Sequence, residues 1–397
     1  MKSKNMFIHR LNNLLKSLTL LWLWLLLSGN NSNAQNFLSI CEGIEHAEIT
    51  RKINGLDVKL NLLRLDPQKI RLDVIHAMDT VNGTETLSSI AKRHAAIAAI
   101  NAGFFRLDRS IFAGTPAGIL MIDGKLLSMS HSGRSAVAII NDSKKTDIAF
   151  AHVDTKVSLK ISNKKIPISG MNRERKTDDI VLFTPEFGRS TLTNPDGWEF
   201  IFQSNNKIPF IGRLVEIRKN KGSSIIPQHG FVLSVSNSKL KSLPYVLKKL
   251  GVIASWQFTI KTIEPSESKF FQMAEDITSG VPQLIRNGEI QITWEQEKTN
   301  QNFVETRHPR TAIAKLKDRR ILLITADGRS EDSGGIALKD LAEFLLQLGA
   351  SEAVNLDGGG STTMVVNGKT VNKPSDKEGE RRIGDAILVF PRVDCKR

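Results

Sequence analysis

Apolar and polar residues alternate along much of the first third of this chain. Between positions 49 and 75 the alternation is regular, as in LDVKLNL at positions 56–62, and this spacing predicts half-buried β-strands. Residues 84–94 place their apolar side chains on one helical face and residues 95–100 form an apolar run, so we expect a helix followed by a buried strand. From position 136 to 231, short apolar segments separated by turn signals predict a β-rich region.

The last third of the chain has the clearest helical pattern. An apolar segment at residues 320–325 is followed by the amphipathic residues 336–348 and then by a second apolar segment at residues 353–356. A strand, a helix and a strand in this order predict a right-handed βαβ unit with parallel strands. A further helix is expected at residues 242–250, with Pro244 in its first turn. The predicted fold class is therefore α/β in the mixed α+β sense, with a β-rich mixed sheet, a C-terminal βαβ unit and few helices.

The length and composition are those of a globular protein. The chain has 397 residues, of which 40% are hydrophobic and 24% are charged, so it can bury a large core. No linker, low-complexity tract or internal repeat divides the sequence. We therefore expect residues 35–397 to form one compact domain.

The N-terminus carries the pattern of an export signal. Four basic residues precede an apolar run at residues 18–27, and small residues up to Ala34 supply a cleavage site. The run is about half as long as a membrane-spanning helix needs to be. The sequence therefore predicts a signal peptide at residues 1–34, no stable membrane anchor, and export to either the periplasm or the medium.

Two cysteines are present, Cys41 and Cys395, near the two ends of the exported chain. Disulfides persist in oxidising compartments, and the termini of a domain often lie close together. These observations favour a disulfide between Cys41 and Cys395 over the alternative of two free thiols.

The chain is strongly basic, with a formal net charge of +14. Four of these charges belong to the signal peptide, and 14 minus 4 leaves +10 for the exported chain. Such a charge suits an anionic substrate, an acidic cell-surface polymer or nucleic acid. We expect no nucleic-acid partner, because the chain has a single Tyr and few aromatic residues among its basic ones. Lys and Arg are spread along the chain, which favours a basic solvated surface over a specific basic patch.

A glycine-rich loop follows the second strand of the predicted βαβ unit. Residues 355–364 read NLDGGGSTTM, in which an aspartate precedes three glycines and three hydroxyl side chains. Consecutive glycines let the main chain approach a ligand closely, and their N–H groups can cradle an anion. The alternative is a flexible Gly/Ser turn. The candidate residues of this loop are Asp357, Gly358, Gly359, Gly360, Ser361 and Thr362.

The predicted βαβ unit brings a second acidic residue to the same place. Its first strand leads into Asp327 and Arg329, and parallel strands end at the sheet edge where ligands bind in α/β proteins. Asp327 and Asp357 thus form a candidate carboxylate pair of the kind that cleaves glycosidic bonds. The alternative is that each aspartate holds a turn.

Three further residues carry weaker signals. Arg310 can pair with two phosphate oxygens, and His308 can transfer a proton near neutral pH. The alternative for His308, beside Pro309, is a structural histidine. Asn101 follows a predicted strand, where it either binds a sugar hydroxyl or phosphate or caps a turn.

Taken together, these motifs resemble the phosphodiester glycosidase family. They occur in order over residues 95–390, and the segments at 371–376 and 380–382 fit the same pattern. The chain departs from the family pattern at Ala102 and at residues 278–284, which leaves its sugar preference open. The motifs are NAGFF at 101–105, PAGI at 116–119 with DGK at 123–125, HPRTA at 308–312, DGR at 327–329, LGA at 348–350 and the loop at 355–364.

The resemblance implies hydrolysis of a sugar 1-phosphodiester to a free sugar and a phosphomonoester. The substrate would be a small molecule or a cell-surface glycan, and no cofactor is required. Either Asp357 or Asp327 would stabilise or attack the anomeric carbon. The implied catalytic residues are Asp357, Asp327, His308 and Arg310, and the implied substrate-binding residues are Asn101, Thr311, Arg329, Arg381 and the residues of the glycine-rich loop.

Two alternatives stay open at this point. A phosphodiesterase that depends on a divalent cation would use Asp327 and Asp357 as metal ligands. A non-catalytic exported module would bind phosphodiester glycans through its basic charge. The sequence sets neither the anomeric configuration of the substrate, nor a metal requirement, nor the oligomeric state.

Overall fold

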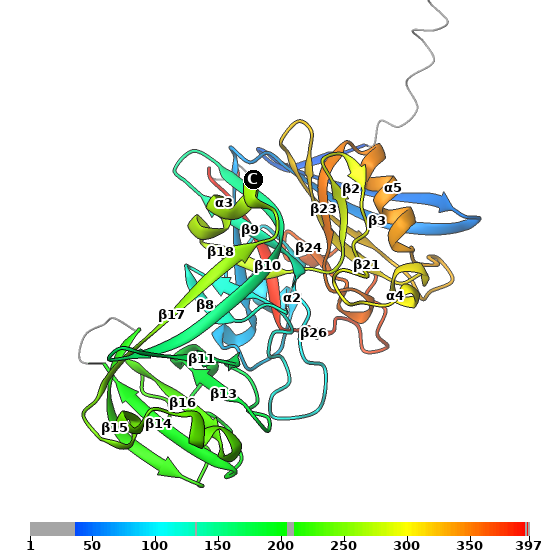
Figure 1. The fold of residues 1–397 in the computed structure, drawn as a ribbon. Helices are drawn as coiled ribbons and strands as arrows, with labels where there is room; N and C mark the ends of the chain where they lie inside the picture. The colour runs from blue at the N-terminus through cyan, green and yellow to red at the C-terminus, as the bar shows by residue number, and fades with distance from the viewer. Residues whose placement is uncertain (1–35, 132, 205–209, 394, 396–397) are drawn as a thin grey trace, which may run out of the picture. The chain divides into compact units, whose positions relative to one another are not determined.

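The computed structural model describes residues 36–131, 133–204, 210–393 and 395 (Figure 1). The predicted signal peptide at residues 1–34 lies outside the described residues. The chain divides into a unit Met1–Leu38 and a unit Ser39–Arg397, and the second unit contains the sheets and helices that form the fold.

An eight-stranded mixed sheet contains the predicted βαβ unit. In spatial order its strands are β1 Leu38–Cys41, β2 Ile44–Ile53, β3 Leu56–Leu65, β22 Ile321–Ala326, β21 Arg310–Leu316, β23 Ala350–Asn355, β19 Gln283–Arg286 and β20 Glu289–Ile290. Strand β21 pairs antiparallel with both β22 and β23, so these two strands run parallel to each other. Helix α5, Leu338–Gln347, connects β22 to β23. The predicted βαβ unit is therefore confirmed, with β21 between its two strands.

A larger sheet, antiparallel except for the β12–β13 pair, contains the predicted β-rich region. Its main path is β12 Gly170–Met171, β13 Ile180–Phe183, β16 Gly230–Ser236, β14 Gly197–Gln203, β15 Ile211–Lys219, β17 Ile253–Thr262, β10 Thr146–Ile161, β9 Arg134–Asn141, β18 Asp276–Ser279, β7 Leu120–Ile122 and β8 Lys125–Ser128, and β11 Lys164–Ile168 pairs with β10. The long strands β10 and β17 pair over nine residues each and link the two halves of this sheet (Figure 1).

A third sheet collects strands that are far apart in the sequence. It runs β25 Lys369–Thr370, β24 Met364–Val366, β6 Ala98–Asn101, β27 Asp385–Pro391 and β4 Ile70–His76, and β26 Arg382–Ile383 pairs separately with β5 Glu85–Thr86. Strand β6 ends at Asn101, β27 begins at Asp385, and β24 follows the glycine-rich loop. Because β24 and β27 both pair with β6, these three chain positions come together.

The described residues contain few α-helices, as expected: α2 Leu87–Arg93, α3 Ser268–Met273, α4 Gln301–Glu305 and α5. None of these helices has the length and apolarity that crossing a membrane requires. Short 3₁₀ turns are η1 Ala77–Asp79, η2 Pro185–Phe187, η3 Asn237–Ser242, η4 Tyr245–Lys248, η5 Pro265–Glu267 and η6 Gly359–Ser361.

The predicted helix at residues 242–250 is wrong. The chain forms the separate turns η3 and η4 there, because Leu243 and Pro244 are extended, with ψ of 143° and 138°. A proline clashes with a helical conformation of the residue before it, so Leu243 cannot continue η3 into η4.

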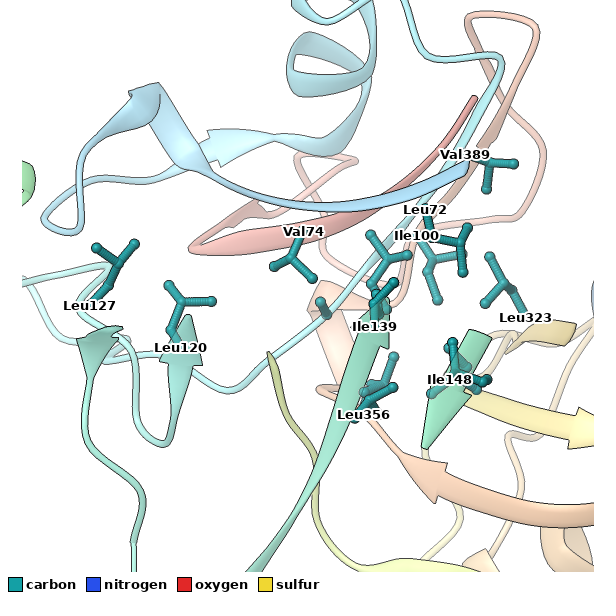
Figure 2. Close-up of a cluster of buried hydrophobic side chains, with 14 of the residues drawn as sticks. Leu72, Val74, Ile100, Leu120, Leu127, Ile139, Ile148, Leu323, Leu356 and Val389 are labelled. Atoms are coloured by element: carbon teal, nitrogen blue, oxygen red, sulfur yellow. The ribbon is translucent and has the colours of Figure 1, made fainter. Parts of the chain in front are cut away.

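Apolar side chains from all three sheets meet in one core. Figure 2 shows this cluster, in which a leucine, isoleucine or valine of each sheet faces the others. Burial of each such side chain contributes about 1.5–3 kcal/mol, so the core fixes the sheets on which the candidate site lies. Labelled members are Leu72, Val74, Ile100, Leu120, Leu127, Ile139, Ile148, Leu323, Leu356 and Val389. A second apolar cluster lies within the largest sheet and includes Phe202, Phe231 and Trp256.

A disulfide joins Cys41, at the end of β1, to Cys395, beyond β27. The two Cα atoms are 5.3 Å apart. The predicted disulfide is therefore confirmed, and it ties the first strand of the fold to the end of the chain.

Candidate active site

The glycine-rich loop is packed tightly against its neighbours. Gly359 has φ +61°, a left-handed conformation that glycine adopts without steric penalty, and its N–H donates to the Pro309 carbonyl at 2.8 Å. A Cβ at Gly358 would lie 2.8 Å from the same carbonyl oxygen, and a Cβ at Gly360 would overlap the Arg381 guanidinium. The loop is therefore a defined structure, which disfavours the alternative of a flexible turn.

Asn101 fixes the main chain of the loop. Its side-chain Nδ2 donates to the carbonyl of Asp357 at 2.6 Å. Its Oδ1 accepts hydrogen bonds from the Thr311 hydroxyl at 2.8 Å and from the Thr363 N–H at 3.1 Å. The amide thus joins β21, β6 and the two ends of the loop. Asn101 therefore holds the main chain of the loop directly, and Thr311 holds Asn101 in place.

The Asp357 carboxyl lies deep among protein atoms, although part of the residue is reachable by solvent. Burial raises its pKa to about 6, against the opposing effects of the Ser361 hydroxyl, the Gly358 N–H and the charge of Arg381. The Gly358 N–H donates to Oδ1 at 2.9 Å. The Ser361 hydroxyl is close enough to the Asp357 carboxyl to favour its charged form. The two groups do not reach ordinary hydrogen-bond geometry.

A second buried carboxyl belongs to Asp385, the first residue of β27. Burial raises its pKa to about 7, the Thr278 hydroxyl and the Gly103 N–H lower it, and the charge of Asp357 raises it further. Thr278 Oγ1 donates to Asp385 Oδ2 at 2.8 Å. Asp357 and Asp385, here called the carboxyl pair, therefore interact and titrate near neutral pH, as acid and base groups of enzymes do.

Three consecutive hydroxyls beyond the glycines are buried and unpaired. Ser361, Thr362 and Thr363 are at most 1% exposed, and their side-chain oxygens have no hydrogen-bond partner among the described protein groups. The Oδ1 atom of Asn355 is unpaired in the same sense. A buried polar group without a partner costs about 1–3 kcal/mol. This hydroxyl row is therefore suited to bind a polar ligand.

Arginine side chains flank the loop on two sides. A Cβ at Gly359 would lie 3.2 Å from Arg329 Nη2, so this guanidinium covers the loop. Arg381 pairs with Asp376 through two contacts of 2.8 and 3.0 Å and lies against Gly360. Positive charge at both sides suits an anionic ligand in the loop.

His308 lies beside Arg329, with Nδ1 3.4 Å from Nη2. Burial lowers the pKa of His308, and the charges of Arg310 and Arg329 lower it further. The ring is therefore neutral at pH 7, and the main chain of His308 forms a bridge with Ile336.

Asp327 follows β22 as predicted, and both of its carboxylate oxygens accept hydrogen bonds. Asn372 Nδ2 donates to Oδ1 at 3.0 Å, and the Lys373 N–H donates to Oδ2 at 3.1 Å. Asn372 also donates to the Thr362 carbonyl at 3.1 Å. Burial raises the pKa of Asp327, and these hydrogen bonds lower it. The geometry makes Asp327 a positioning residue that holds the loop through Asn372.

Arg310 is 2% exposed, and two of its three guanidinium nitrogens donate hydrogen bonds within the chain. Nη2 donates to the carbonyls of Phe303 and Thr306 at 2.6 and 2.9 Å, and Nε donates to the Ile336 carbonyl at 3.4 Å. Its guanidinium carbon lies 4.8 Å from the centre of the Phe303 ring. Burial lowers its pKa to about 10. Arg310 thus secures the end of α4 through Nη2, and its role in binding phosphate stays a prediction.

A pocket of about 640 Å³ adjoins the loop. Arg381 and Asp376, which contact Gly360, also line this pocket. Phe105, Arg106 and Arg109 form part of its wall. The pocket thus lies beside residues that contact the loop.

Within the parts of the chain that the structure describes, no group of three or more His, Cys, Asp or Glu side chains is arranged to hold a metal ion.

Residues 207–390 match the model of the phosphodiester glycosidase family. The chain resembles this family. It is 35% identical over 150 residues to the human N-acetylglucosamine-1-phosphodiester alpha-N-acetylglucosaminidase, a match that covers 36% of this chain and 28% of the relative. The chain thus spans little more than a quarter of that relative's length.

Two solved structures share the fold. A protein from Synechocystis has a TM-score of 0.75 at 23% identity, covering 91% of this chain and 64% of the other. A protein from Burkholderia pseudomallei has a TM-score of 0.70 at 22% identity, covering 85% of this chain and 75% of the other. The family match includes the glycine-rich loop and Asp385, whereas Asn101 and Gly103 lie outside it.

Asp385 is the residue that the sequence interpretation missed. It stands after Gly384 and directly before the buried apolar residues 386–388. A carboxylate at the end of an apolar strand was the signal used for Asp327 and Asp357, and the same signal applies at the start of β27. Thr278 was noted only as part of a departure from the family pattern.

Proposed function

We propose that this chain hydrolyses a sugar 1-phosphodiester to a free sugar and a phosphomonoester. The observation that carries the proposal is the carboxyl pair beside a row of buried, unpaired hydroxyls. Two carboxyl groups are the usual equipment for cleavage at an anomeric carbon. The match to the phosphodiester glycosidase family supports the same substrate class.

The glycine-rich loop binds the phosphate in this proposal. Main-chain N–H groups of consecutive glycines and the hydroxyls of Ser361, Thr362 and Thr363 supply the donors. Arg329 and Arg381 offset the negative charge from two sides. The hydroxyls then gain the hydrogen bonds that they lack in the protein alone.

The carboxyl pair acts at the anomeric carbon. Asp357, with the lower pKa, is charged at pH 7 and stabilises the positive charge that develops on the sugar. A water oxygen attacks the anomeric carbon, the bond from that carbon to the phosphate oxygen breaks, and the bonding electrons leave with the phosphate. Asp385 accepts the proton of the water, a task for which a pKa of about 7 is suitable. Because the departing phosphate is weakly basic, it needs little help from an acid.

We also infer that the chain is exported. Two observations support export: the disulfide between Cys41 and Cys395, which oxidising compartments favour, and the signal pattern of the N-terminal sequence. A substrate outside the cytoplasm would be a sugar phosphodiester in solution or part of a cell-surface glycan.

A panel of sugar 1-phosphodiesters tests the proposal. We expect Asp357→Asn and Asp385→Asn each to lower kcat by about 10²–10⁴-fold. Asp276→Asn is the matched control, because Asp276 is also buried with its pKa raised to about 7 but binds the Val74 and Asp123 N–H groups. Asp327→Asn should lower kcat less than either member of the pair does.

The products in ¹⁸O-labelled water locate the bond that breaks. Label in the sugar supports attack at the anomeric carbon, and label in the phosphate would contradict it. Binding of the panel without turnover by the wild type would favour a non-catalytic binding module. Loss of turnover with a chelator would favour a metal-dependent phosphodiesterase.

A further inference from the structure

The positive charge of the chain is concentrated in one segment. Residues 153–262 contain 18 Lys and Arg and 8 Asp and Glu, so this segment carries +10. Residues 35–152 and 263–397 together contain 33 basic and 33 acidic residues and are neutral. Lys and Arg are spread along the chain, as the sequence shows, but acidic residues are scarce in residues 153–262, so the net positive charge lies in this segment.

Four lysines share one exposed face of the sheet in this segment. Opposed residues of paired strands point to the same side, and neighbours along a strand point to opposite sides. Lys156 and Lys160 are alternate exposed positions of β10, and Lys160 stands opposite Lys165 of β11. Lys261 of β17 stands opposite Asp154 of β10. We call Lys156, Lys160, Lys165 and Lys261 the lysine face.

The other side of these strands belongs to the core. Val157, Leu159 and Ile161 of β10 are at most 3% exposed, and Trp256 of β17 is 5% exposed. The register of the strands is therefore fixed, because a slip by one residue would bury the lysines. The pairing of the strands therefore places all four lysines on the same face.

The ammonium groups of the lysine face make no ion pair or hydrogen bond with any described part of the chain. Lysines elsewhere, such as Lys59, Lys145 and Lys315, do pair with carboxylates. Like charges directly opposite each other destabilise a strand pair, as at Lys160 and Lys165. A partner that supplies negative charge would relieve this repulsion.

Two adjoining pockets hollow this surface. One of about 700 Å³ is lined by Lys156, Lys165 and Lys261 with Ser158, Gln257 and Thr259. The other, of about 510 Å³, shares Lys165 and adds Lys164 and Lys239. The first pocket is also lined by Met129, Pro167, Ile168 and Phe258, and the second by Asp178, so this surface combines cationic, polar and apolar groups.

We propose that the lysine face binds an anionic polysaccharide and holds it against the protein. The hydroxyl and amide groups of Ser158, Gln257 and Thr259 suit sugar hydroxyls between the charges. Nucleic acid fits less well, because the Trp256 ring faces the core and is not available for base stacking.

The choice of a phosphodiester-linked polysaccharide rests on the proposed function, whereas the lysine face itself does not. A polymer that carries the substrate linkage would be held near the enzyme between cleavage events. Holding the polymer requires binding alone, so the lysine face needs no catalytic group of its own.

Binding of a phosphodiester-linked capsular polysaccharide tests the inference. The exported chain in the Asp357→Asn background is titrated with the polymer at 50 and 200 mM salt, so that the probe is not consumed. The test variant is Lys156→Gln, Lys160→Gln, Lys165→Gln and Lys261→Gln together. We expect its Kd to rise at least about tenfold at 50 mM salt, or about 1.4 kcal/mol, and its salt dependence to fall.

The matched control removes the same charge elsewhere: Lys52→Gln, Lys144→Gln, Lys317→Gln and Lys339→Gln, all exposed. Its Kd should stay within about twofold of the parent. Equal weakening in both variants, or no binding of the polysaccharide, would overturn the inference. Tighter binding to phosphatidylglycerol vesicles or to double-stranded DNA than to the polysaccharide would overturn it as well.

Turnover separates this inference from the proposed function. With Asp357 restored, the four-lysine variant should hydrolyse a small sugar 1-phosphodiester at the parent rate. If no variant hydrolyses any such substrate but the lysine face still governs polymer binding, the proposed function fails and the lysine face stands.

Discussion

Replacing Thr362, a member of the hydroxyl row, should stabilise the fold and weaken substrate binding. Its hydroxyl is buried without a partner, and an unpaired buried hydroxyl costs about 1–3 kcal/mol. Thr362→Val replaces it with a methyl group of the same shape. We expect the free energy of unfolding to rise by about 1 kcal/mol. Loss of a hydrogen bond to a charged phosphate, worth about 1.5–3 kcal/mol, should raise KM about 10- to 150-fold.

Urea unfolding and steady-state kinetics on the same preparations measure both effects. Thr311→Val is the matched control, because its buried hydroxyl donates to Asn101 at 2.8 Å. That variant should lose about 1 kcal/mol of stability. If Thr362→Val is destabilised to the same degree and keeps its KM, the hydroxyl is bonded within the protein and does not bind phosphate.

Three further outcomes follow from the structure. The value of kcat/KM should rise with pH through about 6 to 7 as the carboxyl pair loses its protons, and then stay level to pH 8; a fall above pH 7 would show that Asp385 acts as an acid. Cys41→Ser should lower the free energy of unfolding by about 2–5 kcal/mol in urea, and a reductant should then have no further effect. Burial lowers the pKa of His152, but hydrogen bonds to Glu264 and Glu297 outweigh it and raise the pKa to about 9. This charged group therefore stabilises the fold below about pH 6.5, and its contribution is lost as the pH rises through about 9; urea unfolding of His152→Gln should lack this dependence.

The sequence predicted those helices and strands whose pattern of apolar residues lies within one short segment. The βαβ unit was predictable because β22, α5 and β23 each show their own period and follow one another in the sequence. The error at residues 242–250 came from placing Pro244 in the first turn of a helix, whereas the backbone at Leu243 and Pro244 is extended. One local rule, the effect of a proline on the residue before it, was enough to prevent that error.

The site could be predicted only in part, because its geometry depends on long-range pairing. Asp357 and its loop have a local signal, whereas Asp385 lies near them only because β27 pairs with β6. Arg310 and Asp327 stand at the predicted positions of their strands. What their side chains bind is decided by α4 and by Asn372, which no spacing within β21 or β22 reveals.

The separation of charge from the site has a physical advantage for the proposed chemistry. A cation close to a carboxyl lowers its pKa. Arg381 is the cation that lowers the pKa of Asp357, and the charge acting on Asp385 is that of Asp357 itself, which raises the pKa. If the ten excess positive charges surrounded the carboxyl pair, both pKa values would fall and Asp385 would be a weaker base. Charge placed more than a Debye length away, about 8 Å at physiological salt, would not have this effect. The proposed polymer-binding surface lies on β10, β11 and β17, whose sheet carries neither Asp357 nor Asp385. It can therefore attract an anionic substrate while burial keeps the carboxyl pair near neutral pKa.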